Sequence, residues 1–312
     1  MEAVARAILG GRLPASLIAA GLFLATIYMP VVGGLLGLVA AVPAALVGWK
    51  AGLQGLVEVG VIAGVIVALA TLQPFAPVAW LAAFWIPVGA GVLLLRRGPY
   101  FAGVGLGMAL VILGGMAAWV LSLGGSPEDL VRGWVSEGVR AWVEGRGLPE
   151  ADTQRVMGRL QEDLVPLAAR FLPGAIGAGI LLTWGVNLLV GLRLAAAAGE
   201  VPELGPVLRG FRVPDSALWL VIALGVLAWL GAEGPLGYWA ANGLIVMGMP
   251  FLAQGLAVVH SARLAYGLAR GWLVFFYILM GLLTQLVLAV VLLGLADVWA
   301  DFRSKLDSAD SS

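Results

Sequence analysis

Two aspartates, Asp297 and Asp301, close the last hydrophobic stretch of the chain, in the sequence VLLGLADVWADFRSK. Their i,i+4 spacing places both carboxylates on one face of a continuing helix. DxxxD pairs bind Mg²⁺ together with a lipid diphosphate in some membrane transferases, but those enzymes need further acidic ligands and a basic phosphate cradle. The residues around DVWAD supply neither. A lipid-modifying enzyme is therefore only an alternative hypothesis for this chain.

The same residues fit a membrane anchor better. Trp299 belongs at the headgroup level, where indole rings are enriched in membrane proteins, and Asp301 makes a favourable i,i+4 pair with Lys305. With Arg303 between them, these polar groups would stop the helix from sliding along its axis. We expect Asp297 and Asp301 to lie in water at the exit of the helix.

Glu58, in GLVEVGVIAG, is the acid that the sequence places inside a hydrophobic span. A charge within a span costs on the order of 3 kcal/mol on insertion scales, so we expect this carboxylate to face the bundle interior, a water-filled cavity or a partner. Because Glu58 lies near the cytoplasmic end of its span, it could instead reach back to water. Together with Lys50 it forms the charged part of a candidate ligand site.

Uncharged polar side chains also occur within the hydrophobic stretches, at Asn187, Asn242, Gln254, Thr284 and Gln285. Such side chains are typical of hydrogen bonds between membrane helices. They could also line one site together. The ligand-binding candidates are therefore Glu58, Lys50, Asn187, Asn242 and Gln254.

Other catalytic motifs are absent from the sequence. The single histidine, His260, cannot build an HExxH zinc site, and there is no GxxxxGK[ST] phosphate loop or GxSxG nucleophile elbow. The absence of cysteine excludes disulfides, thiolate metal sites and cysteine nucleophiles. We expect no enzymatic activity, no catalytic residue, no metal and no cofactor.

The composition determines the class of protein that must position these residues. The chain is 61% hydrophobic and 12% charged, with a mean hydropathy of +1.01. This predicts an all-α, polytopic integral membrane bundle, in which the 45 glycines would let helices approach closely. The formal net charge is zero, so nothing points to nucleic acid as a partner.

Nine hydrophobic stretches form the predicted spans: residues 13–29, 31–48, 53–72, 76–95, 100–122, 171–192, 216–231, 236–259 and 272–296. Pro30 separates the first two because proline interrupts a helix. The predicted domains are an N-terminal bundle, an extramembrane insertion, a C-terminal bundle and a polar tail: residues 1–123, 124–170, 171–296 and 297–312.

The placement of arginine and lysine predicts the orientation of the spans. With the N-terminus in the cytoplasm, the loops on that side carry ten cations and four acids: Arg6, Arg12, Lys50, Arg96, Arg97, Arg193, Arg209, Arg212, Arg263 and Arg270 against Glu2, Glu200, Glu203 and Asp215. The alternation of nine spans then places the insertion and the C-terminus on the other side of the membrane.

The insertion begins with SPED, a helix start in which Ser126 is the N-cap, proline follows and acids occupy the first turn. Apolar residues including Trp134 and Trp142 then recur at three- and four-residue intervals, which predicts an amphipathic helix. A second amphipathic helix starts near Pro149. The pair would lie on the membrane surface, or would cover a cavity or dock a partner.

The C-terminal motifs carry a family resemblance. GLAVVHSARLAYGLARGW (255–272) and GLADVWADFR (294–303), preceded by RGFRVPDSALWL (209–220), resemble the YybS-like family of predicted bacterial membrane proteins. ALVGWKAGLQG and LLLRRGPYFAGVGLG fit the N-terminal half of that family. The resemblance implies a multi-pass protein of the bacterial inner membrane. It also implies that the N-terminal half is similar to the substrate-binding membrane subunits of energy-coupling-factor transporters, although this chain has about three more spans and the insertion.

We therefore predict a transporter-like module that binds a small molecule within its helical bundle and has no ATPase of its own. Its partners would be the lipid bilayer, the ligand and a membrane or cytoplasmic protein. This hypothesis predicts a cavity near Glu58 and Lys50. The alternative, a non-catalytic scaffold that docks partners, predicts a dry and closely packed bundle.

Overall fold

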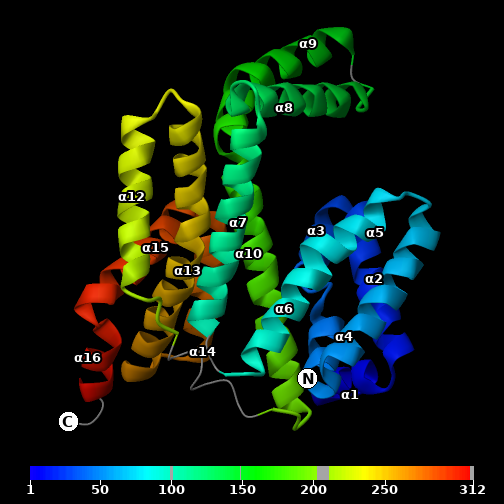
Figure 1. The fold of residues 1–312 in the computed structure, drawn as a ribbon, viewed down its shortest axis with the longest axis vertical. Coiled ribbons are helices and arrows are strands. Elements are labelled where there is room, and N and C mark those ends of the chain that lie inside the picture. Colours follow the sequence, from blue (N-terminus) through cyan, green and yellow to red (C-terminus); the bar gives the residue numbers. More distant parts are fainter. Residues whose placement is uncertain (99–100, 148, 202–210, 310–312) are drawn as a thin grey trace. The chain divides into compact units, whose positions relative to one another are not determined.

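The structure is a computed structural model that describes residues 1–98, 101–147, 149–201 and 211–309. All regular secondary structure in these residues is helical, as the sequence predicts (Figure 1). Five helical runs within the described residues are long and apolar enough to cross a membrane, or seven if each of two sharply bent helix pairs is one span. This confirms a helical protein with several apolar segments, but it does not confirm nine spans.

Two features account for the difference between nine predicted spans and seven candidates. The predicted spans 31–48 and 53–72 belong to one helical run, Val32–Thr71. The predicted span 216–231 forms a helix at Ser216–Leu230, and this helix is shorter than a membrane crossing normally requires.

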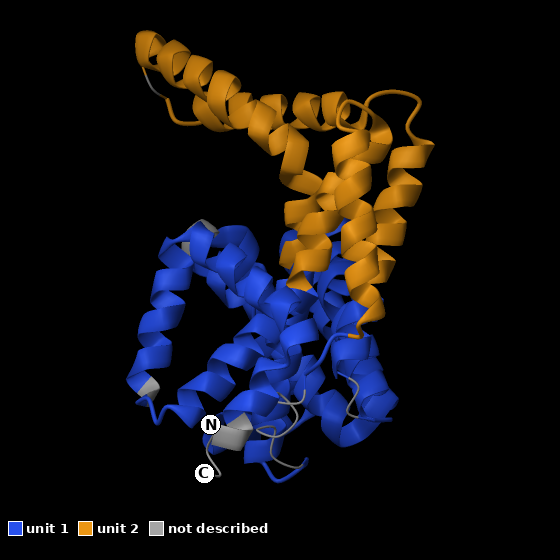
Figure 2. Ribbon diagram, turned by 90° about the vertical axis from the view of Figure 1, so that its left-hand side faces the viewer, with its two compact units in different colours: residues 1–108, 180–213, 250–312 blue, residues 109–179, 214–249 orange. Residues whose placement is uncertain are grey.

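The chain forms two compact units, which are described separately (Figure 2). Unit 1 contains Met1–Met108, Ile180–Val213 and Pro250–Ser312, and unit 2 contains Ala109–Gly179 and Pro214–Met249. The division predicted from the sequence, with boundaries at residues 123, 170 and 296, stays a prediction.

Unit 1 is built from short and interrupted helices: α1 (Glu2–Leu9), α2 (Arg12–Tyr28), α3 (Pro30–Gly37), α4 (Val42–Thr71), α5 (Phe75–Ala79), η1 (Trp80–Trp85), α6 (Ile86–Leu95), α14 (Arg270–Leu282), α15 (Thr284–Ala300) and α16 (Phe302–Ala309). It also holds the start of α7 (Phe101–Ser122), the second half of α10 (Val165–Ala197) and the end of α13 (Pro235–Ala265). Pro30 is the first residue of α3, where its missing N–H is tolerated.

Aromatic residues of the π-helical segment η1 pack against α4 in the core of unit 1. Trp80 is fully buried and its indole N–H donates to Gly60 O over 3.2 Å. The indole N–H of Trp85 donates to Leu56 O over 2.8 Å. A Cβ added at Gly60 would lie 2.1 Å from the Trp85 indole, so only glycine allows this approach.

Unit 2 contains α8 (Pro127–Glu144), α9 (Glu150–Arg159), the π-helical segment η2 (Leu160–Leu164), α12 (Ser216–Leu230) and the remaining parts of α7, α10 and α13. The predicted N-cap is confirmed, because the Ser126 side chain accepts a hydrogen bond from the Asp129 N–H over 3.3 Å. The predicted amphipathic helices are α8 and the run from α9 into η2.

Candidate functional site

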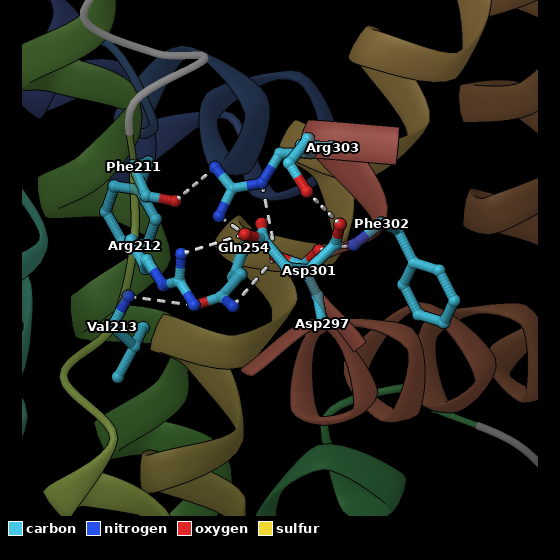
Figure 3. A network of polar contacts seen from close by, with 9 residues as sticks. Phe211, Arg212, Val213, Gln254, Asp297, Asp301, Phe302 and Arg303 are labelled. Carbon is cyan, nitrogen blue, oxygen red and sulfur yellow. Dashed lines mark hydrogen bonds and ion pairs between the residues drawn. The ribbon is translucent and has the colours of Figure 1, made fainter. Parts of the chain in front are cut away.

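A buried ion pair between Asp297 and Arg303 lies in unit 1, where α15 ends and α16 begins (Figure 3). The Asp297 side chain is fully buried, and the Arg303 side chain is 10% exposed. Asp297 Oδ2 accepts hydrogen bonds from Arg303 Nε over 3.1 Å and Gln254 Nε2 over 3.0 Å, and lies 2.9 Å from Arg303 Nη2. We call Gln254, Asp297 and Arg303 the Asp297 cluster. The expectation that Asp297 lies in water is wrong.

The helix end explains why these residues meet. α15 ends at Ala300, and Asp301 follows with φ 44° and ψ 55°, a left-handed conformation that reverses the chain. The turn brings the Phe302 N–H within 3.0 Å of Asp297 Oδ1. Since the helix does not continue through Asp301, the two carboxylates do not share a face. Asp301 instead lies 3.5 Å from Arg212, and both side chains are more than 40% exposed.

Close packing of α13 against α15 places Gln254 beside Asp297. A Cβ on Gly255 would lie 2.0 Å from Val290 O, and a Cβ on Gly294 would lie 2.0 Å from Phe251 O. These two glycines therefore set the separation of the helices. Gly255 directly follows Gln254, and Gly294 lies about one turn before Asp297, so the close approach brings the amide within reach of the carboxylate.

The Asp297 cluster holds the extended segment 211–213 by its main chain. Arg303 Nη1 donates to Phe211 O over 2.8 Å, and the Val213 N–H donates to Gln254 Oε1 over 2.8 Å (Figure 3). A carboxylate has about four lone-pair sites, and Asp297 already receives one N–H from Gln254, two from Arg303 and one from Phe302. Protein donors therefore occupy all of the acceptor sites of the Asp297 carboxylate, and the cluster has a structural role.

This geometry gives the DxxxD hypothesis no support. The carboxylate of Asp297 is fully used by protein donors, and that of Asp301 faces Arg212. In the part of the chain that the structure describes, no group of three or more His, Cys, Asp or Glu side chains could hold a metal ion. Trp299 is 74% exposed, as an anchor in the headgroup layer would be.

Glu58 and Lys50 lie on either side of a break in α4. Gly52 interrupts this helix with φ 69° and ψ −150°, a conformation open in practice only to glycine. Arg96 Nη1 donates to Gly48 O over 2.9 Å, and Gly48 O is the carbonyl that the N–H of residue 52 would bond in a regular helix. A Cβ at Gly52 would lie 2.8 Å from Arg96 Nη1. The Arg96 guanidinium therefore donates to a carbonyl of α4 at the point where the helix is interrupted.

An ion pair lies on each side of this break along the helix. Glu58 pairs with Arg12 and accepts a hydrogen bond from Gln54 Nε2 over 3.0 Å. Lys50 Nζ lies 2.8 Å from Glu200 Oε1. The Glu58 side chain is 30% exposed, so it is neither fully buried nor free in solvent. We call Arg12, Lys50, Glu58, Arg96 and Glu200 the α4 break cluster.

The side-chain amides of the ligand-binding candidates Asn187, Asn242 and Gln254 form hydrogen bonds with main-chain groups, and each amide bonds different residues. Asn187 Nδ2 donates to Leu38 O over 3.0 Å and to Thr183 O over 2.7 Å. Its Oδ1 is buried without a hydrogen-bond partner among the described residues. Gln254 belongs to the Asp297 cluster. These contacts are the helix-to-helix hydrogen bonds that polar residues in spans are expected to make.

Two side chains of α13, Tyr238 and Asn242, form hydrogen bonds with main-chain groups of α10 around Pro173. Proline has no N–H, so Ala169 O lacks its donor four residues later, and the Tyr238 hydroxyl donates to that oxygen over 2.9 Å. On the next rung, Asn242 Oδ1 accepts from the Gly174 N–H over 2.7 Å while Nδ2 donates to the carbonyl of residue 170 over 2.9 Å. Asn242 thus bridges the two groups that bond each other in a regular helix.

The sequence did not indicate several residues that the geometry makes important. Arg96 was counted only as a loop cation, and its contact with Gly48 joins residues 48 positions apart. Arg12 was not identified as the partner of Glu58. A usable signal existed for Tyr238, because Pro173 inside an apolar stretch predicts a carbonyl that needs another donor.

The family comparison agrees with this picture of apolar, closely packed helices. A model of the family described as Predicted membrane protein (DUF2232) matches residues 17–298. The chain belongs to this family. The match spans both units and includes the Asp297 carboxylate and the α4 break. A search of curated proteins and a search of solved structures find no match. The resemblance to YybS-like proteins and to energy-coupling-factor subunits stays a prediction.

Proposed function

We propose that this membrane protein is a transporter-like module that binds a small molecule at the α4 break cluster and depends on other proteins for energy. The observation that carries this proposal is the interruption of an apolar helix at Gly52, with charged side chains around it. In membrane transporters, discontinuous helices and intramembrane charges mark substrate sites. The resemblance to energy-coupling-factor subunits that the sequence predicts favours the same function by analogy.

The contacts narrow the proposed site. Asn187, Asn242 and Gln254 bond main-chain groups, so they are not needed to explain ligand binding. In the α4 break cluster, by contrast, Arg12 pairs with Glu58 and Lys50 pairs with Glu200 through side chains that stay partly exposed. Arg12 and Lys50 are 46% and 50% exposed. A ligand can compete for such pairs because an exposed ion pair contributes only about 0–1 kcal/mol.

The charge balance indicates the chemistry of the ligand. The α4 break cluster contains three cations and two acids, so it carries one surplus positive charge. Arg96 contributes that charge, and its guanidinium donates to the main-chain carbonyl of Gly48. We therefore expect a small polar molecule with a carboxylate or phosphate group, which guanidinium and ammonium groups bind well.

The test is to purify the full chain from native membranes and to identify bound small molecules by mass spectrometry. Glu58→Gln and Lys50→Gln should each lower the amount of bound molecule several-fold without unfolding the protein, because each breaks a partly exposed pair. Glu137→Gln removes an exposed acid in unit 2 and should leave it unchanged. Equal occupancy in all three variants would place the ligand elsewhere.

The scaffold alternative also has an observation in its favour. The side chains of Asn242 and Gln254 and the rest of the Asp297 cluster have their hydrogen bonds satisfied by protein partners, as a dry bundle requires. This alternative predicts that purification recovers companion proteins and no stoichiometric small molecule. The same mass-spectrometry experiment therefore separates the two functions.

A further inference from the structure

The insertion in unit 2 forms a hairpin, with α8 as one arm and α9 with η2 as the other. In both views it runs crosswise to the upright segments of α7, α10, α12 and α13 in the same unit (Figures 1 and 2). Two hydrogen bonds join its arms: Ser136 Oγ donates to Gln161 Oε1 over 3.1 Å, and Gln161 Nε2 donates to Ser136 O over 3.4 Å. The hairpin is thus a packed part of unit 2.

The hairpin starts where an apolar helix ends. α7 is long and apolar enough to cross a membrane and ends at Ser122, and Ser126 caps α8 a few residues later. A helix that is long enough to cross the hydrocarbon layer ends near the lipid headgroups. A hairpin that begins there and runs crosswise to the helix follows the plane of the membrane.

One face of α8 is turned toward that apolar helix end. Trp119, in the last turn of α7, packs near Trp134 with ring centroids 6.2 Å apart. Trp142 lies about two turns further along the same broad face, and the Arg146 guanidinium is 4.3 Å from its ring centroid. The tryptophans of α8 remain 57% and 53% exposed. Indole rings with one apolar and one wet side are characteristic of the headgroup layer.

The charge of the hairpin does not indicate binding to anionic lipids. Residues 126–170 contain six arginines and eight acids, a net charge of −2. Membrane-surface helices that rely on anionic lipids carry clusters of basic residues instead. Contact with the bilayer would therefore depend on the two indoles.

We propose that the α8 face bearing Trp134 and Trp142 is inserted among the lipid headgroups, so that the hairpin is an in-plane membrane contact of unit 2 that needs no anionic lipid. The occupant of this exposed face is the bilayer surface. The argument rests on the crosswise hairpin, the contact between Trp119 and Trp134, and the exposure of the indoles. It does not depend on the proposed ligand.

Two glycines of α8 provide a matched pair of probes. Gly138 lies between the tryptophans on their face, whereas Gly133 is five residues earlier and about 140° around the helix. A Cβ at either position would meet nothing within 4 Å, so cysteine fits at both. The chain has no other cysteine, and both tryptophans are kept. Gly138→Cys and Gly133→Cys can each be labelled with an environment-sensitive fluorophore in the full chain.

The labelled proteins are reconstituted into vesicles of phosphatidylcholine alone and of phosphatidylcholine with phosphatidylglycerol. We expect lipids with a headgroup nitroxide to quench the probe at residue 138 at least about twofold more than the probe at residue 133, equally in both vesicles. Iodide should show the opposite order. Equal quenching at the two positions, protection of residue 138 from both quenchers, or quenching only with phosphatidylglycerol would each overturn the proposal.

Discussion

Replacing Asp297 with alanine would leave the Arg303 guanidinium in a site where its side chain is only 10% exposed, without the carboxylate that binds it. Removing one partner of a buried ion pair costs about 3–5 kcal/mol because the other charge stays buried. The amide of Gln254 also loses its acceptor. We therefore expect the free energy of unfolding to fall by about 4 kcal/mol.

Asp301→Asn is the matched control, because asparagine removes the charge and still tolerates the left-handed conformation of this residue. Asp301 also faces an arginine, but the distance is 3.5 Å and both side chains are more than 40% exposed, so the expected loss is about 0–1 kcal/mol. The two variants remove the same chemical group from positions four residues apart. Their difference therefore reports burial and not the number of carboxylates.

The assay is unfolding of the purified full chain in mixed micelles by a denaturing detergent, followed by tryptophan fluorescence. The double variant Asp297→Leu with Arg303→Met should recover much of the loss, because apolar residues of similar volume replace buried ion pairs at little cost. If Asp297→Ala lost no more stability than Asp301→Asn, the Asp297 cluster would not be a main contributor to the stability of unit 1. Failure of the double variant to recover would instead show that the main-chain contacts of the cluster dominate.

Two further experiments test the helix breaks. Gly52→Ala should destabilise the protein by about 1–3 kcal/mol, since the φ and ψ of residue 52 suit only glycine. The control Gly114→Ala, in open space on α7, should be neutral or stabilising by up to about 1 kcal/mol. Equal effects of the two variants in thermal unfolding would contradict the break in α4. Tyr238→Phe should cost about 1–3 kcal/mol by leaving a buried carbonyl without a donor. Combining it with Pro173→Ala should restore part of that loss, because alanine supplies the missing N–H, and a purely additive double variant would refute this account.

Local signals in the sequence were sufficient for the helical class and for several element boundaries. Ser126 could be identified as an N-cap because capping depends only on the next three residues. The periodicity of the insertion likewise predicted α8. The break at Gly52 could not be found in this way, because glycine is also common inside packed membrane helices and the decisive contact comes from Arg96, far along the chain.

The surroundings of the candidate site residues were predicted less well, because they too depend on contacts between residues far apart in the chain. Burial of Asp297 requires a left-handed residue at Asp301 and close packing of α13 on α15, and hydrophobic periodicity shows neither. The i,i+4 argument assumed a continuous helix and therefore paired the wrong carboxylates. Glu58 was singled out as a charge inside a span, and its surroundings depend on Arg12, a tertiary partner.

The polar residues within the apolar segments can be sorted by what they bond. Beside Pro173, side chains of α13 take the place of missing helix hydrogen bonds, and Arg96 does the same beside Gly52. These groups stabilise interruptions of the main chain, because an unbonded carbonyl in an apolar layer costs more than the side chain that satisfies it. Glu58 and Lys50 differ, since they bond other side chains and remain partly exposed. A ligand could replace their partners without leaving a main-chain group unsatisfied, so these two residues are the ones at which substitution should change binding without unfolding the helices.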